Sequence, residues 1–255
     1  MRVLEAGAGR PIVLLHPFPL HANYWAPQLS APPAGWRLLA PDLRGFGTQG
    51  AGDAPAETLD AHARDIAAML DARRIDRAVV AGVSMGGYIA FAMARLAPAR
   101  MSAIVLANTR MDADPPDALE KRTAMLDLIA REGSAGVARD MPRLLGDTAM
   151  RERPDMVARV RAMIEEAPAE GIAAAVRAMM SRPDSTATAS AWRGPALILT
   201  GSEDVLTPPP LQDAMRAVMP GAAHETIGGA GHLASFERPG DFNAALLRFL
   251  HTLPA

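Results

Sequence analysis

The sequence predicts an α/β fold, with a mostly parallel sheet flanked by helices and an all-helical segment inserted between two strands. Short apolar runs recur along the chain, as expected for strands that are buried on both faces of a parallel sheet. Helical periodicity separates several of these runs. From about residue 110 to about residue 193 the strand-like runs stop, and helical patterns follow one another.

The predicted strands come from six apolar runs of strand length. The runs are IVLLH at 12–16, RLLAPD at 37–42, AVVAGV at 78–83, SAIVLAN at 102–108, ALILTG at 196–201 and AHETIG at 223–228. All but the last are nearly continuous in apolar residues. Strands that alternate with helices in this way indicate one sheet with right-handed crossovers.

Two flanking helices are predicted from the spacing of their apolar residues. Leu59, Ala63 and Ile66 fall on one helical face. Near the C-terminus, Pro239 is expected to open a helix, because proline is favoured at the first helical position. The apolar stripe of that second helix consists of Phe242, Leu246, Phe249, Leu250 and Leu253.

The all-helical segment, residues 110–193, is expected to form a cap subdomain inserted into a core made of residues 1–109 and 194–255. Met156, Val160 and Met163 exemplify its helical spacing. Eight of the fifteen methionines of the chain lie in this segment. Two interpretations of them stay open: adaptable walls of an apolar pocket, or filling of gaps in a core with few aromatic residues.

Composition excludes several classes of function. The net charge of −2 over 255 residues gives no electrostatic reason to expect nucleic acid or an anionic membrane as a partner. The chain has no cysteine, which excludes disulfides, thiolate catalysis and metal sites with cysteine ligands. We find no signal peptide and no apolar run of about 18 residues, so we expect a cytoplasmic protein with no membrane span. The oligomeric state is left open.

A serine lies between a predicted strand and a predicted helix. Gly82, Ser84 and Gly86 fit the pattern G-x-S-x-G, in which a sharp turn holds the serine hydroxyl above the sheet. The helix N-terminus then points toward any negative charge that develops beside the hydroxyl. The alternative is a serine that merely caps a helix in a glycine-rich turn, and the presence of catalytic partners decides between the two.

Serine is a weak nucleophile at neutral pH and needs a base, for which His232 is the candidate. His232 follows the last predicted strand in a glycine-rich loop, IGGAGHLASFERP, at the end of the sheet where α/β folds keep their catalytic groups. His16 ends a strand and is expected to tie loops together. The other histidines, His21, His62, His224 and His251, are expected at the surface. No two histidines have the spacing of a helical zinc pair, so no metal site is expected.

The base in turn needs a carboxylate that orients it. Glu203 and Asp204 both follow the strand at 196–201, and the alternative is that they only form a polar turn. We favour Asp204 because the shorter acid suits a tight turn. Ser84, Asp204 and His232 then occur in the chain order of one well-known triad arrangement.

With these residues in view, the chain resembles the α/β-hydrolase superfamily over essentially its whole length. Five segments match in order: LLHPFPL, PDLRGFG, GVSMGGYIAFAMA, LTGSEDVLTPP and GGAGHLASFERP. The resemblance implies a sheet of about seven strands and roles for Ser84 as nucleophile, His232 as general base and then acid, and Asp204 as the orienting group. It also implies an oxyanion hole made by the backbone N–H groups of Phe18 and Met85, whose side chains are expected to line the pocket.

The chain departs from the family pattern at three places. His16 is followed by Pro17 where the family has glycine, although the implied N–H donor is Phe18. The family has a strand pair before IVLLH, and with only residues 2–5 available we expect one edge strand to be missing. After RGFG, Thr48 and Gln49 replace the usual serine.

The predicted function is hydrolysis of a small carboxylic ester or lactone through an acyl-enzyme, without a cofactor. Within the superfamily, LANTR at 106–110 and LASFE resemble 3-oxoadipate enol-lactonases. An enol-lactone substrate carries a carboxylate, which Arg110 or Arg177 can hold unless both are solvated surface residues. The alternatives are an enol-lactonase, C–C bond hydrolase or perhydrolase with the same triad, or a hydrolase-like receptor for a small ligand.

Overall fold

The computed structural model describes residues 1–47, 54–140 and 142–254. Its described residues form a sheet of order β1-β3-β2-β4-β5-β6-β7, in which β1 is antiparallel to β3 and the other neighbours are parallel. The strands are β1 (Val3–Gly7), β2 (Arg10–Leu15), β3 (Trp36–Pro41), β4 (Ala78–Val83), β5 (Met101–Ala107), β6 (Ala196–Gly201) and β7 (Ala223–Ile227). The predicted sheet of about seven mostly parallel strands is confirmed.

All six predicted strands are present, and their bounds differ from the predicted ones by at most two residues. The continuous apolar runs of β4 and β6 are buried along their whole length, as strands covered on both faces must be. Before β2 the described residues form one strand, β1, where the resemblance implies a pair. Thr48 and Gln49 lie outside the described residues.

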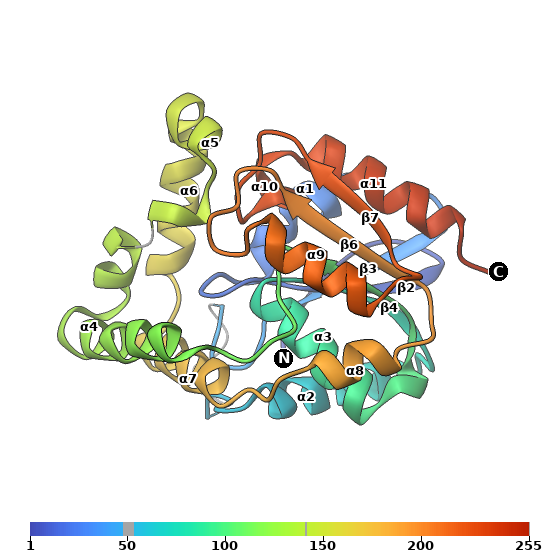
Figure 1. The fold of residues 1–255 in the computed structure, drawn as a ribbon, viewed down its shortest axis with the longest axis horizontal. Coiled ribbons are helices and arrows are strands. Elements are labelled where there is room, and N and C mark those ends of the chain that lie inside the picture. The colour runs from blue at the N-terminus through green and yellow to red at the C-terminus, as the bar shows by residue number, and fades with distance from the viewer. Residues whose placement is uncertain (48–53, 141, 255) are drawn as a thin grey trace.

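Helices cover both faces of the sheet (Figure 1). One layer contains α2 (Leu59–Ala72), α3 (Met85–Leu96), α8 (Thr186–Ala191) and α9 (Pro209–Val218). The other contains α1 (Ala26–Leu29) and α11 (Pro239–His251), with the short α10 (Ala234–Glu237) beside them. The predicted apolar faces of α2 and α11 are the buried ones, and Pro239 is the first residue of α11.

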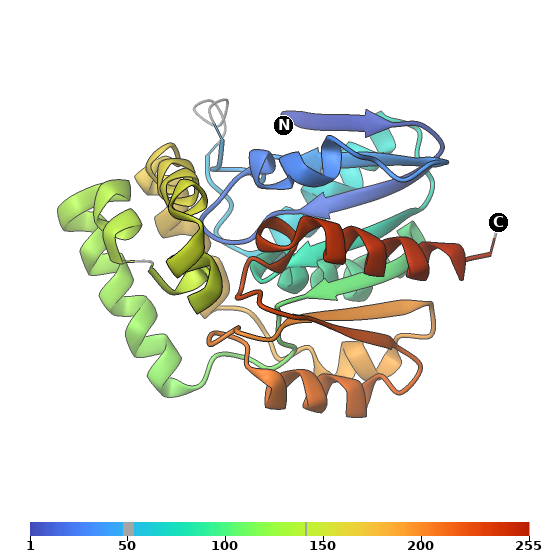
Figure 2. The ribbon, with the colours of Figure 1, turned by 90° about the horizontal axis from the view of Figure 1, so that it is seen from above.

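Four helices between β5 and β6 pack on one another at one end of the sheet (Figures 1 and 2). They are α4 (Pro116–Asp140), α5 (Asp147–Glu152), α6 (Pro154–Glu165) and α7 (Ala169–Met180). The backbone of α4 departs from helical geometry at Gly133. By contrast, α8 packs against α3 and α9 in the layer beside the sheet, although it falls within the predicted cap segment.

The parallel strands all point toward these four helices (Figure 2). Their register aligns the carboxyl ends, with Leu15 beside Gly82, Val83 beside Ala107 and Gly201 beside Ile227. Residues that follow β2, β4, β5, β6 and β7 therefore meet at one edge of the sheet, beneath the helical segment. None of the described helices is long and apolar enough to cross a membrane.

The expectation that His21 and His62 lie at the surface is wrong, because both are fully buried. His62 lies three residues after Leu59 and four before Ile66, so the periodicity of α2 places it on the buried face. Neither ring nitrogen of His62 has a hydrogen-bond partner among the described residues. Burial lowers the pKa of His62 to about 4; Asp65 raises it by less, and Arg44 lowers it further.

We therefore expect His62 to make stability depend on pH. The unfolded state takes up a proton near pH 6.5 and the folded state only near pH 4, so stability falls as pH drops through this range. At pH 5 the loss amounts to about 2 kcal/mol relative to pH 8. The free energy of unfolding, measured with urea at both pH values, should fall less in His62→Leu than in wild type. The difference between the two proteins should be about 2 kcal/mol. Equal losses in the two proteins would contradict the account.

Candidate active site

Ser84 occupies a strained turn between β4 and α3. Its φ of 53° is a left-handed value that costs a non-glycine residue about 1–3 kcal/mol. The turn is tight, since a Cβ added to Gly82 would lie 2.1 Å from the carbonyl oxygen of Gly86. A Cβ on Gly86 would lie 2.3 Å from the carbonyl oxygen of Leu15, at the end of β2. Both flanking positions of the G-x-S-x-G pattern thus require glycine.

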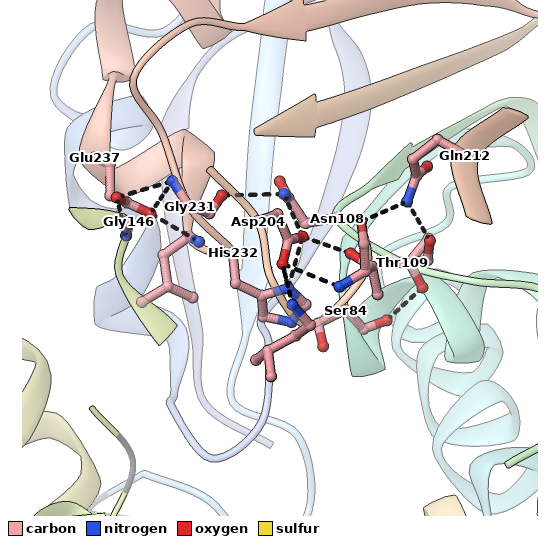
Figure 3. A network of polar contacts seen from close by, with 12 residues as sticks. Ser84, Asn108, Thr109, Gly146, Asp204, Gln212, Gly231, His232 and Glu237 are labelled. Carbon is pink, nitrogen blue, oxygen red and sulfur yellow. Dashed lines mark hydrogen bonds and ion pairs between the residues drawn. The ribbon is translucent and has the colours of Figure 1, made fainter. Parts of the chain in front are cut away.

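The backbone of Ser84 is hydrogen-bonded to the last residue of β5 and to the segment that follows it. Its N–H donates to the carbonyl of Ala107 at 3.0 Å, and its carbonyl accepts from the Thr109 hydroxyl at 2.8 Å. The Gln212 side chain in turn donates to the carbonyl of Thr109 at 2.8 Å (Figure 3). These bonds hold the strained turn at a fixed place above the sheet.

Asp204 and His232 form a buried pair. The two carboxylate oxygens of Asp204 lie 2.9 and 3.0 Å from Nδ1 of His232, and each residue is about 3% exposed. The carboxylate also accepts from the N–H groups of Leu206 and Thr207 and from the side chains of Thr207 and Asn108. This geometry leaves Nε2 of His232 free of Asp204 and able to act on another group.

The electrostatics keep Asp204 ionised. Burial raises the pKa of Asp204, but His232 and the hydrogen bonds from Thr207 and Asn108 lower it further, so that the net pKa is well below the usual range. A carboxylate that stays charged fixes the imidazole with Nδ1 as the hydrogen-bond donor. The pair thus has the features of a base whose tautomer is set by its partner.

Ser84 and His232 line the same pocket, which has a volume of about 400 Å³. The Ser84 side chain lies beside the His232 ring in Figure 3. The other lining residues are Phe18, Tyr88, Arg110, Asp114, Pro115, Asp117, Ala118, Lys121, Arg122, Met125, Leu144, Val176, Met179, Val205, Leu206 and Thr207. The pocket therefore lies between the sheet edge and the helices α4 and α7.

Two of the expected pocket residues are found elsewhere. The Met85 side chain is fully buried and is not among the described residues that line the pocket, because it enters the core at the start of α3. Arg177 does not line it either, since this residue lies on the outer face of α7. Its side chain is 46% exposed and pairs with Glu57 at 2.8 Å. The structure thus argues against Arg177 as a substrate contact.

Arg110 does line the pocket, but its guanidinium is paired with Asp112. Asp112 raises the pKa of Arg110, and Arg110 lowers the pKa of Asp112, so both groups stay charged. Deeper in the wall, Arg182 is buried against Asp114 at 2.7 Å and stacks on Tyr88. Arg110 thus lines the pocket already paired with a carboxylate, and Arg182, which does not line it among the described residues, is paired behind Tyr88 and Asp114.

His16 supports the loop that carries Phe18. Its Nδ1 lies 3.1 Å from the carbonyl of Pro17, and its Nε2 lies 3.1 Å from the backbone nitrogen of Leu43, which donates to it. Burial lowers the pKa of His16 to about 3, so the ring is neutral and can both donate and accept. The expected role of His16, tying loops together, agrees with these bonds.

Several residues that support the site were missed from the sequence: Asn108, Thr109, Thr207, Gln212 and Glu237. Asn108 and Thr109 directly follow β5, so the reasoning that selected Asp204 after β6 applies to them too. The carboxylate of Glu203, which was rejected in favour of Asp204, accepts instead from the N–H and the hydroxyl of Thr148. Among the described residues, no three His, Asp or Glu side chains are grouped as a metal ion would require.

Comparisons with known proteins show the family of this chain. A family model described as alpha/beta hydrolase fold matches residues 10–239. A solved thermophilic esterase from Thermogutta terrifontis, with malate bound, is 35% identical with a TM-score of 0.95, over 100% of this chain and 94% of its own.

Enol-lactonases are also similar to the chain. The solved enol-lactonase from Burkholderia xenovorans LB400 is 26% identical with a TM-score of 0.88, over 98% of this chain and 96% of its own. The 3-oxoadipate enol-lactonase 1 of Acinetobacter baylyi is 27% identical over 86% of this chain and 80% of its own. The predicted resemblance to relatives of this kind is confirmed.

Proposed function

Because this chain belongs to the alpha/beta hydrolase family, we propose that it is a serine hydrolase that cleaves a small carboxylic ester or lactone through an acyl-enzyme. One observation carries the proposal. His232, which is paired with the buried Asp204, lines the same pocket as Ser84, which sits on a strained turn. In such an arrangement the hydroxyl is the nucleophile and the imidazole is its base. The carboxylate orients the imidazole and stabilises its protonated form.

The reaction runs in two halves on these residues. In the first, Nε2 of His232 takes the proton of the Ser84 hydroxyl as the serine oxygen attacks the carbonyl carbon, and then gives that proton to the leaving alcohol. In the second, His232 takes a proton from water, and the resulting hydroxide attacks the acyl carbon. His232 then gives the proton to the Ser84 oxygen as its bond to the acyl carbon breaks. Asp204 stays ionised throughout and stabilises the imidazolium.

The backbone N–H groups of Phe18 and Met85 serve as the oxyanion hole in this proposal. Met85 is the first residue of α3, where N–H groups have no acceptor within the helix and the helix dipole favours negative charge. The contact of Gly86 with the carbonyl of Leu15 brings this helix end against the end of β2, three residues before Phe18. Both amides thus belong to segments that meet beside Ser84.

The helices α4 to α7 act as a cap over the pocket. The division into a core of residues 1–109 and 194–255 and a cap remains our proposal, with one adjustment. Because α8 packs against α3 and α9, we assign it to the core and end the cap before Ser185. The cap contributes apolar residues such as Met125, Val176 and Met179 to the pocket wall.

The charges in the wall favour a substrate without a carboxylate. Three cations of the described residues line the pocket, and each has an acidic partner: Arg110 with Asp112, Lys121 with Asp117, and Arg122 with Asp114, which also binds Arg182 behind the wall. An anionic substrate would have to compete with these carboxylates for the cations. Val205 and Leu206, which also line the pocket, are exposed apolar residues. An uncharged ester or lactone with an apolar group fits these walls best.

A substrate panel tests this proposal. We expect p-nitrophenyl butyrate to be cleaved with a higher kcat/KM than 3-oxoadipate enol-lactone, and peroxide plus acetate to react slowly. Asp112→Asn should free Arg110 and raise the relative rate on the carboxylated lactone, whereas Asp213→Asn, which breaks a surface pair with Arg216, should not. A clear preference of the wild type for the enol-lactone would contradict the substrate class. No turnover of any ester, together with ligand-induced stabilisation, would indicate a receptor.

A further inference from the structure

Glu237, the last residue of α10, places its carboxylate at the backbone of the His232 loop. It is 4% exposed, and one oxygen accepts from the N–H groups of Gly231 and Leu233, both at 3.0 Å. These two amides flank His232 directly. The carboxylate therefore fixes the backbone on both sides of the imidazole (Figure 3).

The second oxygen of Glu237 reaches the helical segment that covers the pocket. It accepts from the N–H of Gly146 at 2.8 Å, just before α5 begins. The approach is close, since a Cβ added to Gly231 would lie 2.1 Å from the nitrogen of Gly146. The cap and the His232 loop thus meet backbone to backbone at this point, with Glu237 joining them.

A second carboxylate binds the same turn of α5. Glu203 accepts from the N–H of Thr148 at 2.8 Å and from the Thr148 hydroxyl. Glu203 directly precedes Asp204, so each of the two loops that supply the acid–imidazole pair is tied to α5 by a neighbouring glutamate. Of the two glutamate side chains, that of Glu237 also accepts from the backbone N–H groups on both sides of His232.

The chemistry at this point requires a carboxylate rather than a neutral group. Burial raises the pKa of Glu237, and hydrogen bonds from Gly231, Gly146 and Leu233 offset only part of this increase, so the requirement for a carboxylate comes from the hydrogen-bond geometry. Three N–H groups converge on it, and only a carboxylate offers two acceptor oxygens to them. A glutamine keeps one acceptor and turns an N–H toward the remaining donor, so it must lose either the cap contact or a loop contact.

We propose that Glu237 is a positioning residue that holds the His232 imidazole in line with Asp204 and couples this alignment to the docking of α5. The inference rests on the proposed function, in which His232 is the base. Without Glu237 the loop is free to shift, and a displacement of about 1 Å can cost a reaction about 10²-fold. Binding of substrate, which depends on the pocket walls, should change much less.

The test compares Glu237→Gln with Glu203→Gln, and with Glu225→Gln, whose glutamate forms a surface pair with Arg248. We expect Glu237→Gln to lower kcat about 10- to 100-fold with little change in KM. Glu203→Gln should retain more of kcat, because it breaks only the contact to Thr148, and Glu225→Gln should behave as wild type. A folded Glu237→Gln with unchanged kcat, or an equal loss in Glu203→Gln, would overturn the proposal.

A second readout does not depend on activity. The proton between Nδ1 of His232 and Asp204 should give a downfield ¹H resonance in wild type that broadens or disappears in Glu237→Gln. If no ester is turned over at all, the proposed function fails, yet this resonance still reports whether Glu237 aligns the pair; an unchanged resonance overturns the inference. In wild type, the amide protons of Gly146, Gly231 and Leu233 should exchange slowly, and fast exchange would contradict their bonds to Glu237.

Discussion

Replacing Ser84 with alanine is expected to lower kcat toward esters by about 10⁶. The hydroxyl is the atom that forms the acyl-enzyme, and no neighbouring group can replace it. The reaction that remains depends on backbone donors and substrate binding alone. Steady-state rates on p-nitrophenyl butyrate, with protein purified free of host esterases, measure the effect.

The stability of Ser84→Ala should not fall. Ser84 adopts a positive φ because the turn forces it to, and alanine meets the same constraint with a side chain of similar size. Ser30→Ala serves as the matched control, since Ser30 lies in an exposed turn and its hydroxyl donates to the carbonyl of Pro27. Ordinary esterase activity in Ser84→Ala would show that the proposed mechanism is wrong.

Asp204→Asn is expected to lower kcat by about 10⁴ with the fold intact. The backbone donors of Leu206 and Thr207 will keep the amide oxygen toward themselves, which turns the amide N–H₂ toward His232. The amide nitrogen then takes the place of the oxygen that lies 2.9 Å from Nδ1 and donates to it, so we expect the proton to move to Nε2, where the ring can no longer act as a base toward Ser84. The rate on an activated ester, measured beside the melting temperature, separates this effect from loss of structure.

Asp213→Asn on α9 is the control for Asp204→Asn, because it removes a carboxylate that only pairs with Arg216 at the surface. Loss of the correct tautomer is expected to lower kcat by about 10⁴. If Asp204→Asn lowers kcat by less than about tenfold, Asp204 does not orient the base.

Much of the site was predictable from the sequence because the carboxyl ends of parallel strands meet at one edge. Buried strands are recognisable as continuous apolar runs, and Ser84 and Asp204 each follow one of them, whereas His232 follows β7, which is less apolar and only partly buried. The glycines of the G-x-S-x-G pattern indicate the sharp turn, because the turn leaves no room for a side chain at these positions. The same reasoning applies to Asn108 and Thr109 after β5, which were overlooked because neither residue type takes part in the chemistry itself.

The errors arose where tertiary packing decides the outcome. His62 has a polar side chain, yet the periodicity of α2 places it on the buried face. Arg177 lies in the segment over the pocket, but its position on α7 directs it outward to Glu57. The pairing of Arg110 with Asp112 and the contact of Glu237 with Gly146 depend on loop geometry that no local pattern encodes.

The most direct measurement of the central claim is the site of covalent labelling by a fluorophosphonate, mapped by mass spectrometry of the digested protein. We expect one phosphonyl adduct, on the peptide containing Ser84, with complete loss of ester turnover. An adduct on a different residue, or an unlabelled Ser84 in a protein that still hydrolyses esters, would contradict the account.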